Sequence, residues 1–185
     1  MNTTIYFVRH AHSTYTPDEL GRPLSEQGLA DAHKITACLE YENIDCVIAS
    51  PYKRAIQTVE GVAFAHQKEI QLVDAFRERL LSSRPLVNFS DAVQKVWRDP
   101  SFSWEGGESN DEAQKRAVEQ LTKLLHTHEG QTIVIGTHGN IMMLMMNYYD
   151  AAYGYECWSQ LRMPDLYKLT FSRQNLVTIQ RVSTH

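Results

Sequence analysis

The sequence predicts an α/β protein, a three-layer α/β/α sandwich whose central sheet is mostly parallel. Two observations support this prediction. Short apolar runs typical of buried strands alternate with longer stretches in which apolar residues recur at helical spacing. The chain of 185 residues has no internal repeat or linker, so it fits one domain, 1–185, that is long enough to bury a substantial core.

Apolar runs and helix-start signals locate the elements in the first part of the chain. Ser25 is a suitable N-cap for a helix after the first strand, and Glu26 suits the positive end of that helix. Ser50 followed by Pro51 predicts a second helix that starts at residue 51 and runs to about residue 66. The predicted strands of this part are 5–8, 45–49 and 70–73.

The segment 79–107 has a different character. It contains two prolines, the pair Gly106-Gly107 and four large aromatic residues that follow no clean period. We predict an excursion from the sheet, partly helical around 91–97, that acts as a lid or specificity segment. Two interpretations of its aromatic residues remain open, a small secondary core and a cover over the substrate.

Regular order resumes after this excursion. Ser109 and Glu112 have the spacing of a capping box, which predicts the start of a long helix. A strand at 131–136 and a helix at 140–149 should follow, with the methionines of that helix in the core. The remaining two strands, 166–171 and 176–181, are predicted to form an antiparallel hairpin.

Composition narrows the class of function. The net charge of −4 argues against binding to nucleic acid, which needs a basic face. Cys38, Cys46 and Cys157 have no paired spacing, which indicates reduced thiols in a cytoplasmic protein. No signal peptide is evident and no apolar run is long enough to cross a membrane. We therefore expect no nucleic-acid or membrane partner, and the oligomeric state is left open.

Three predicted strands end on residues suited to phosphate chemistry. Carboxyl ends of parallel strands share one edge of a sheet, where ligands bind, and helices that start there point N–H groups at anions. Arg9 and Arg54 can each grip phosphate oxygens through a planar fork. Their charges favour a neutral His10, the form that attacks phosphorus. His138 is placed to stabilise the transferring group.

These residues lie in motifs that resemble a known family. Arg9-His10-Ala11 resembles the RHG signature of the histidine phosphatase superfamily, which has the phosphoglycerate-mutase-like fold. The later motifs of that family are similar, in order, to 50–58 (SPYKRAIQT), Arg77-Glu78-Arg79, Gly107-Glu108-Ser109 and Thr137-His138-Gly139. The resemblance covers nearly the whole chain, and the four segments together are far more specific than any one alone.

The resemblance implies a mechanism and a set of site residues. His10 would attack the phosphoryl group and form a phosphohistidine, while Glu78 would serve as proton donor. The phosphoryl oxygens would be held by Arg9, Arg54 and His138, with His138 as the second catalytic histidine. Thr16 stands where an asparagine of the family often helps to bind phosphate. No metal or cofactor is implied, so the predicted function is metal-independent hydrolysis of small phosphate monoesters.

Departures from the family pattern leave alternatives open. Ala11 stands where the family has a glycine, and alanine would be strained there if the backbone has a positive φ. His12 stands where the family commonly has a glutamate. The spacing of His10 and His12 also suits a metal site, although Arg9 would repel the ion. Two other functions remain, a phosphoglycerate-type mutase that uses the same phosphohistidine and a non-catalytic module that binds a phosphorylated ligand. Family mutases generally carry longer insertions, which favours the phosphatase.

Overall fold

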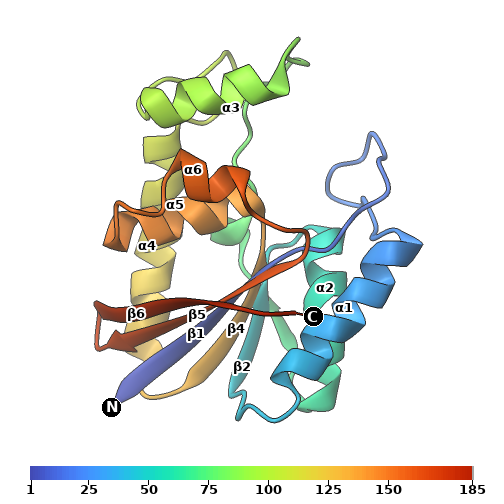
Figure 1. Ribbon diagram of the computed structural model, residues 1–185, viewed down its shortest axis with the longest axis vertical. Coiled ribbons are helices and arrows are strands. Elements are labelled where there is room, and N and C mark those ends of the chain that lie inside the picture. Colours follow the sequence, from blue (N-terminus) through green and yellow to red (C-terminus); the bar gives the residue numbers. More distant parts are fainter. Residues whose placement is uncertain (185) are drawn as a thin grey trace.

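A six-stranded sheet forms the middle layer of the computed structural model, which describes residues 1–184 (Figure 1). The strand order is β3-β2-β4-β1-β5-β6; β1 to β4 are parallel to one another, β5 pairs antiparallel with β1, and β6 pairs antiparallel with β5. The sheet is therefore mostly parallel, as predicted. The strands are β1 (Asn2–Arg9), β2 (Cys46–Ala49), β3 (Ile70–Leu72), β4 (Thr132–Thr137), β5 (Asp165–Ser172) and β6 (Asn175–Val182).

Helices cover both faces of this sheet, which confirms the predicted three layers (Figure 1). Helices α1 and α2 pack on one face, whereas α4 and α5 pack on the other; α3 lies at one end of the molecule, away from the sheet. The helices are α1 (Glu26–Leu39), α2 (Lys53–Ala65), the short 3-10 helix η1 (Asp74–Phe76), α3 (Phe89–Arg98), α4 (Asn110–Thr127), α5 (Gly139–Tyr149) and α6 (Tyr155–Ser159).

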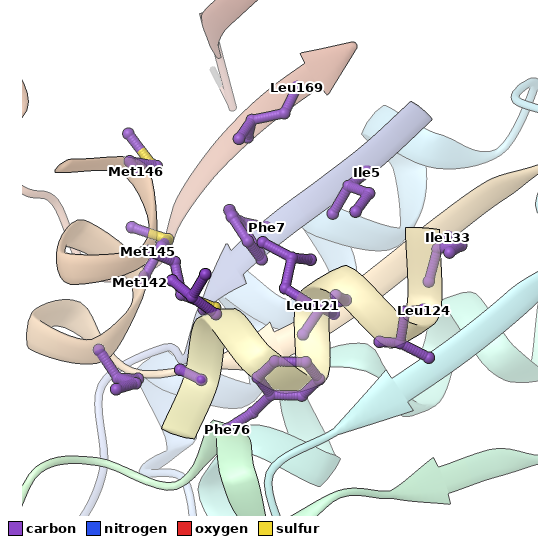
Figure 2. Close-up of a cluster of buried hydrophobic side chains, with 14 of the residues drawn as sticks. Ile5, Phe7, Phe76, Leu121, Leu124, Ile133, Met142, Met145, Met146 and Leu169 are labelled. Atoms are coloured by element: carbon purple, nitrogen blue, oxygen red, sulfur yellow. The ribbon is translucent and has the colours of Figure 1, made fainter. Parts of the chain in front are cut away.

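The two cores follow from the alternation of side chains along the strands. Ile5 and Phe7 of β1 pack against α4 and α5, whereas Tyr6 and Val8 pack against α1 and α2. Figure 2 shows Met142 and Met145 of α5 close to Phe7 in the first of these cores. All four methionines of this helix are fully buried, which confirms their place in the core: Met142, Met143, Met145 and Met146.

The strand register brings three chain segments to one edge. Arg9 at the end of β1 is paired with Thr137 at the end of β4. Ala49 at the end of β2 is paired with Gly136 of β4. The residues that follow these three strands therefore leave the sheet side by side, at the edge where ligands bind in parallel sheets.

Most helix starts agree with the sequence, and one does not. Ser25 and Ser109 cap α1 and α4, and Ser109 forms the predicted capping box. The prediction that α2 begins at residue 51 was wrong, because α2 begins at Lys53 with Tyr52 as its N-cap. The Ser50 hydroxyl lies 2.8 Å from Nε2 of His138 and also accepts a long hydrogen bond, 3.4 Å, from the N–H of Tyr52. Ser50 therefore contacts the candidate site and does not cap α2.

The 79–107 segment contains the helix that the sequence predicted. Helix α3 spans 89–98, and Phe102 packs edge-on against Trp104 at a ring-centroid distance of 4.7 Å. Trp97 packs instead against the main core. The aromatic residues thus divide between a local pair and the core, while Phe89 is exposed. The short helix α6 is an element that the sequence did not predict.

Two further observations concern the whole described chain. Cys38, Cys46 and Cys157 are all free thiols. Within residues 1–184, every helix is too short or too polar to cross a bilayer.

Candidate active site

Three side chains from three separate motifs meet at the carboxyl edge of the sheet. His10 follows β1, Arg54 lies in the first turn of α2, and His138 follows β4. The imidazole rings of His10 and His138 have centroids 5.1 Å apart, and Nε of Arg54 lies 3.3 Å from Nε2 of His10. All three residues are buried. The structure thus brings these three predicted site residues together at one place, which we call the cup.

Two contacts fix the state of the His10 ring. Its Nδ1 lies 2.8 Å from the carbonyl oxygen of Ala11, which can only accept a hydrogen bond. Its Nε2 accepts a hydrogen bond from Nε of Arg54. Burial is the main cause that lowers the pKa of His10; together with the charges of Arg54, Arg9 and Arg22, and against the Ala11 hydrogen bond, which raises it, the pKa falls to about 3. His10 is therefore neutral at pH 7, with its proton on Nδ1 and a lone pair on Nε2.

Arg54 has every nitrogen of its guanidinium engaged. Besides the bond from Nε to His10, Nη1 donates to the backbone oxygen of Glu19 at 2.8 Å, and Nη2 lies 3.4 Å from a Glu19 carboxylate oxygen. Arg22 forms an ion pair with the same carboxylate. Burial lowers the pKa of Arg54, and Glu19 opposes that shift. The loop before α1 thus places an internal anion on the arginine expected to bind phosphate.

Arg9 is held at the edge of the cup by a distant part of the chain. Its Nη1 donates to the carbonyl oxygens of Leu161 and Arg162, at 3.1 and 2.9 Å. Its Nε is buried and has no hydrogen-bond partner among the described residues. A Cβ at Gly139 would lie 2.9 Å from this nitrogen, so the glycine allows the guanidinium to approach the start of α5.

His138 is fully buried beneath the cup. Its Nε2 lies 2.8 Å from the hydroxyl oxygen of Ser50, and the Tyr52 ring packs edge-on at a centroid distance of 5.0 Å. Burial lowers the pKa of His138 well below its ordinary value, and the neighbouring His10 and Arg54 lower it further. His138 is therefore a neutral hydrogen-bonding group in this state.

Glu78 docks on the first turn of α5. Its Oε2 accepts a hydrogen bond from the backbone N–H of Asn140, and its Oε1 accepts bonds from the N–H groups of Ile141 and Arg79, each close to 3 Å. We expected the start of α5 to donate N–H groups to a bound substrate. In this structure it donates them to Glu78, because a side-chain carboxylate from the segment after η1 already reaches it.

A cleft lies beside Glu78. It has a volume of about 440 Å³ and is lined by Tyr52, Arg77, Glu78, Leu80, Gly107 and Glu108, among others. Tyr52 contacts both the cleft and His138, so a ligand in the cleft lies near the buried histidine.

The first loop accommodates its departures from the family pattern. Within residues 1–184 only Gln67 and Arg173 combine a side chain with a positive φ, so Ala11 is unstrained. Its N–H donates to the hydroxyl of Thr58, which itself donates to the carbonyl of Arg54. The Ala11 side chain is fully buried.

Two other positions of the loop lie apart from the cup. The Thr16 hydroxyl donates to the carbonyl of Asp18, and its role in phosphate binding stays a prediction. His12 is exposed, and its Nδ1 lies 2.9 Å from the hydroxyl of Ser25.

A comparison with family models decides the assignment. The model of the histidine phosphatase superfamily (branch 1) matches residues 5–179. The chain belongs to the histidine phosphatase superfamily. The matched residues include His10, Arg54 and His138, and their catalytic roles stay predictions from the sequence motifs.

Solved structures with the same fold include phosphatases and a mutase. A mycobacterial glucosyl-3-phosphoglycerate phosphatase has a TM-score of 0.78 at 15% identity, and the match covers 98% of this chain and 97% of that chain. A phosphoserine phosphatase from Entamoeba histolytica (0.79, 19% identity, 98% of each chain) and a phosphoglycerate mutase from Bacillus anthracis (0.76, 13%, 98% and 92%) are also similar. These likenesses establish the phosphoglycerate-mutase-like fold. No curated protein matches the sequence.

Proposed function

We propose that this histidine phosphatase is a metal-independent phosphatase that hydrolyses small phosphate monoesters through a phosphohistidine on His10. The observation that carries the proposal is the state of His10. Its ring is neutral, its proton is directed to the Ala11 carbonyl, and its unprotonated Nε2 accepts a hydrogen bond from a guanidinium that can bind phosphate. The nucleophilic nitrogen of His10 and the anion-binding guanidinium of Arg54 are thus in direct contact.

In the first step, the Nε2 lone pair of His10 attacks phosphorus in line, and the bond from phosphorus to the leaving oxygen breaks. As the substrate binds, the Nε–H of Arg54 has to exchange its hydrogen-bond acceptor, from Nε2 of His10 to a phosphoryl oxygen. This exchange frees the lone pair of His10. Arg9, Arg54 and His138 then hold the three phosphoryl oxygens, whose charge rises in the transition state.

Glu78 completes the proposed cycle by moving protons. Its protonated carboxyl gives a proton to the leaving oxygen, so the alcohol departs uncharged. The resulting carboxylate takes a proton from a water molecule, whose oxygen attacks phosphorus. The bond between phosphorus and Nε2 breaks, its electron pair returns to His10, and inorganic phosphate is released.

The cleft beside Glu78 supports a small substrate. Its volume of about 440 Å³ suits a metabolite-sized organic group, with Tyr52 and Leu80 as apolar walls. The three free thiols support a reducing compartment, and we propose the cytoplasm. A small phosphorylated molecule is the proposed partner, and no nucleic acid or membrane is required.

Release of inorganic phosphate is the experiment that tests this function. Purified protein should release phosphate from p-nitrophenyl phosphate and from members of a panel of phosphorylated metabolites, equally with and without EDTA. Turnover should need no bisphosphate primer. His10→Ala should abolish release, whereas His12→Ala, which alters an exposed histidine two residues away, should retain it.

Chemical trapping identifies the nucleophile. A brief reaction followed by a quench without acid should leave phosphate on His10 that acid then removes. An acid-stable adduct on another residue, or turnover that survives in His10→Ala, would overturn the proposal. A requirement for a bisphosphate primer would indicate a mutase, and phosphate binding without any turnover would indicate a binding module.

A further inference from the structure

A buried asparagine joins the segment 79–107 to the proposed proton donor. Asn140 is the second residue of α5 and is only 5% exposed. Its backbone N–H donates to Oε2 of Glu78 at 3.0 Å. Its side-chain oxygen accepts a hydrogen bond from the indole N–H of Trp97 at 3.1 Å. Asn140 therefore contacts Trp97 and Glu78 through different atoms.

A second amide supports the same junction. The side-chain nitrogen of Asn140 lies 3.5 Å from the side-chain oxygen of Asn110, at the start of α4. The side-chain nitrogen of Asn110 donates to the carbonyl of Val96 in α3 at 2.9 Å. Helices α3, α4 and α5 are thus joined by side-chain hydrogen bonds at one point: α3 donates one bond through Trp97 and accepts another at the carbonyl of Val96.

The position of the Glu78 carboxylate depends on this junction. Besides the N–H of Arg79 next to it in the chain, its donors are the N–H groups of Asn140 and Ile141, both in the first turn of α5. Any rotation or shift of that turn moves the carboxylate with it. The side chain of Asn140 ties that turn to α3 through its hydrogen bond with Trp97.

We propose that Trp97 and Asn140 are positioning residues for Glu78, so that the placement of α3 sets the geometry of proton transfer to the leaving group. This inference rests on the proposed function. A catalytic acid has to lie within hydrogen-bond reach of the leaving oxygen, and small displacements cost rate. Loss of the Trp97 hydrogen bond therefore affects the step that needs the acid and spares the binding of the phosphoryl group.

The test uses Trp97→Phe, which removes the indole N–H but keeps an aromatic ring in the core. With a simple alkyl phosphate, whose leaving oxygen is basic, kcat should fall about tenfold, whereas with p-nitrophenyl phosphate it should fall less than about twofold. KM should stay unchanged for both substrates. Trp104→Phe is the matched control, since the Trp104 indole N–H has no hydrogen-bond partner within residues 1–184, and it should leave both rates unchanged.

A double-mutant cycle separates positioning from general damage. In a Glu78→Gln background, where the acid is absent, Trp97→Phe should produce no additional selective loss on the alkyl phosphate. An equal loss on both substrates, or a selective loss that persists without Glu78, would overturn the inference. Asn140→Ala removes the acceptor of the same bond and should reproduce the selectivity, with thermal unfolding as the check on folding. Wild-type protein without turnover would contradict the proposed function itself, which is a different outcome.

Discussion

Nε of Arg54 and Nε2 of His10 lie 3.3 Å apart, so the arginine donates its hydrogen bond to the lone pair of the proposed nucleophile. In the ligand-free protein this contact satisfies a buried ring nitrogen that would otherwise lack a partner. The phosphoryl group has to replace that contact, which couples substrate binding to exposure of the nucleophile. In the proposed mechanism Arg54 is therefore both the ligand of the phosphate and, at rest, the donor to the lone pair of His10.

Replacement of Arg54 by lysine should lower kcat/KM by about 100-fold on p-nitrophenyl phosphate. Lysine retains the charge but cannot offer two parallel N–H groups to the phosphoryl oxygens. Steady-state kinetics measure the effect. Arg84→Lys is the control, because Arg84 is exposed and forms a surface ion pair with Glu105. Comparable rates for the Arg54→Lys protein and the wild type would remove Arg54 from phosphate binding.

Neutralisation of Glu19 should tighten the binding of inorganic phosphate. The Glu19 carboxylate contacts both Arg54 and Arg22, so an incoming anion has to displace it. Glu19→Gln weakens that internal competitor, and the inhibition constant of phosphate should fall about five- to tenfold, the effect of about 1 kcal/mol. Glu60→Gln on the exposed side of α2 should leave the constant unchanged. Weaker phosphate binding in Glu19→Gln would show that Glu19 assists the ligand instead.

Acid should destabilise the folded protein through His10 and His138. Both are neutral in the folded state, and the folded pKa of His10 is about 3, whereas an unfolded histidine has a pKa of about 6.5. Above pH 6.5 neither state binds these protons. As the pH falls from 6.5 to 5, only the unfolded state binds them, so the free energy of unfolding decreases, by up to about 1.4 kcal/mol per pH unit for each histidine.

Urea unfolding at several pH values checks this dependence. His10→Asn should flatten the slope between pH 6.5 and 5 by the contribution of one proton. His33→Asn should leave the slope unchanged, since His33 is exposed on α1. A wild-type stability that is constant over this range would show that the buried imidazoles accept protons in the folded state.

Glu78→Gln should lower turnover more for poor leaving groups than for nitrophenolate. General acid catalysis contributes about 10²–10⁴-fold where the leaving oxygen is basic, and much less where it departs readily as an anion. Rates on an alkyl phosphate and on p-nitrophenyl phosphate measure the difference, with Glu105→Gln as an exposed control. The assignment of Glu78 as the donor does not survive an equal loss on both substrates.

The sequence was sufficient for those parts of the fold and site that depend on local patterns. Short apolar runs placed the strands, and Ser25 and Ser109 placed two helix starts, because capping chemistry is local. The gathering of His10, Arg54 and His138 was predictable because the carboxyl ends of parallel strands share one edge of the sheet.

Contacts made across the fold could not be predicted in the same way. Ser50 has the pattern of an N-cap, yet its hydroxyl contacts His138, 88 residues later. Glu19 lies in an irregular loop with no periodic signal, so its pairing with Arg54 depends on how that loop folds back. The docking of Glu78 on α5 likewise depends on the folded position of that helix, because Glu78 bonds to N–H groups that lie about 60 residues later in the chain.

The anchoring of Arg9 to the carbonyls of Leu161 and Arg162 means that an intact set of motifs does not guarantee a working protein. A shortened relative that stops before the residue equivalent to Leu161 would still carry all the motifs up to Thr137-His138-Gly139. It would nevertheless lack the backbone that orients its first arginine and the strand that flanks β1. When genomes are searched for active members of this group, the tail of each candidate therefore needs the same scrutiny as its histidines.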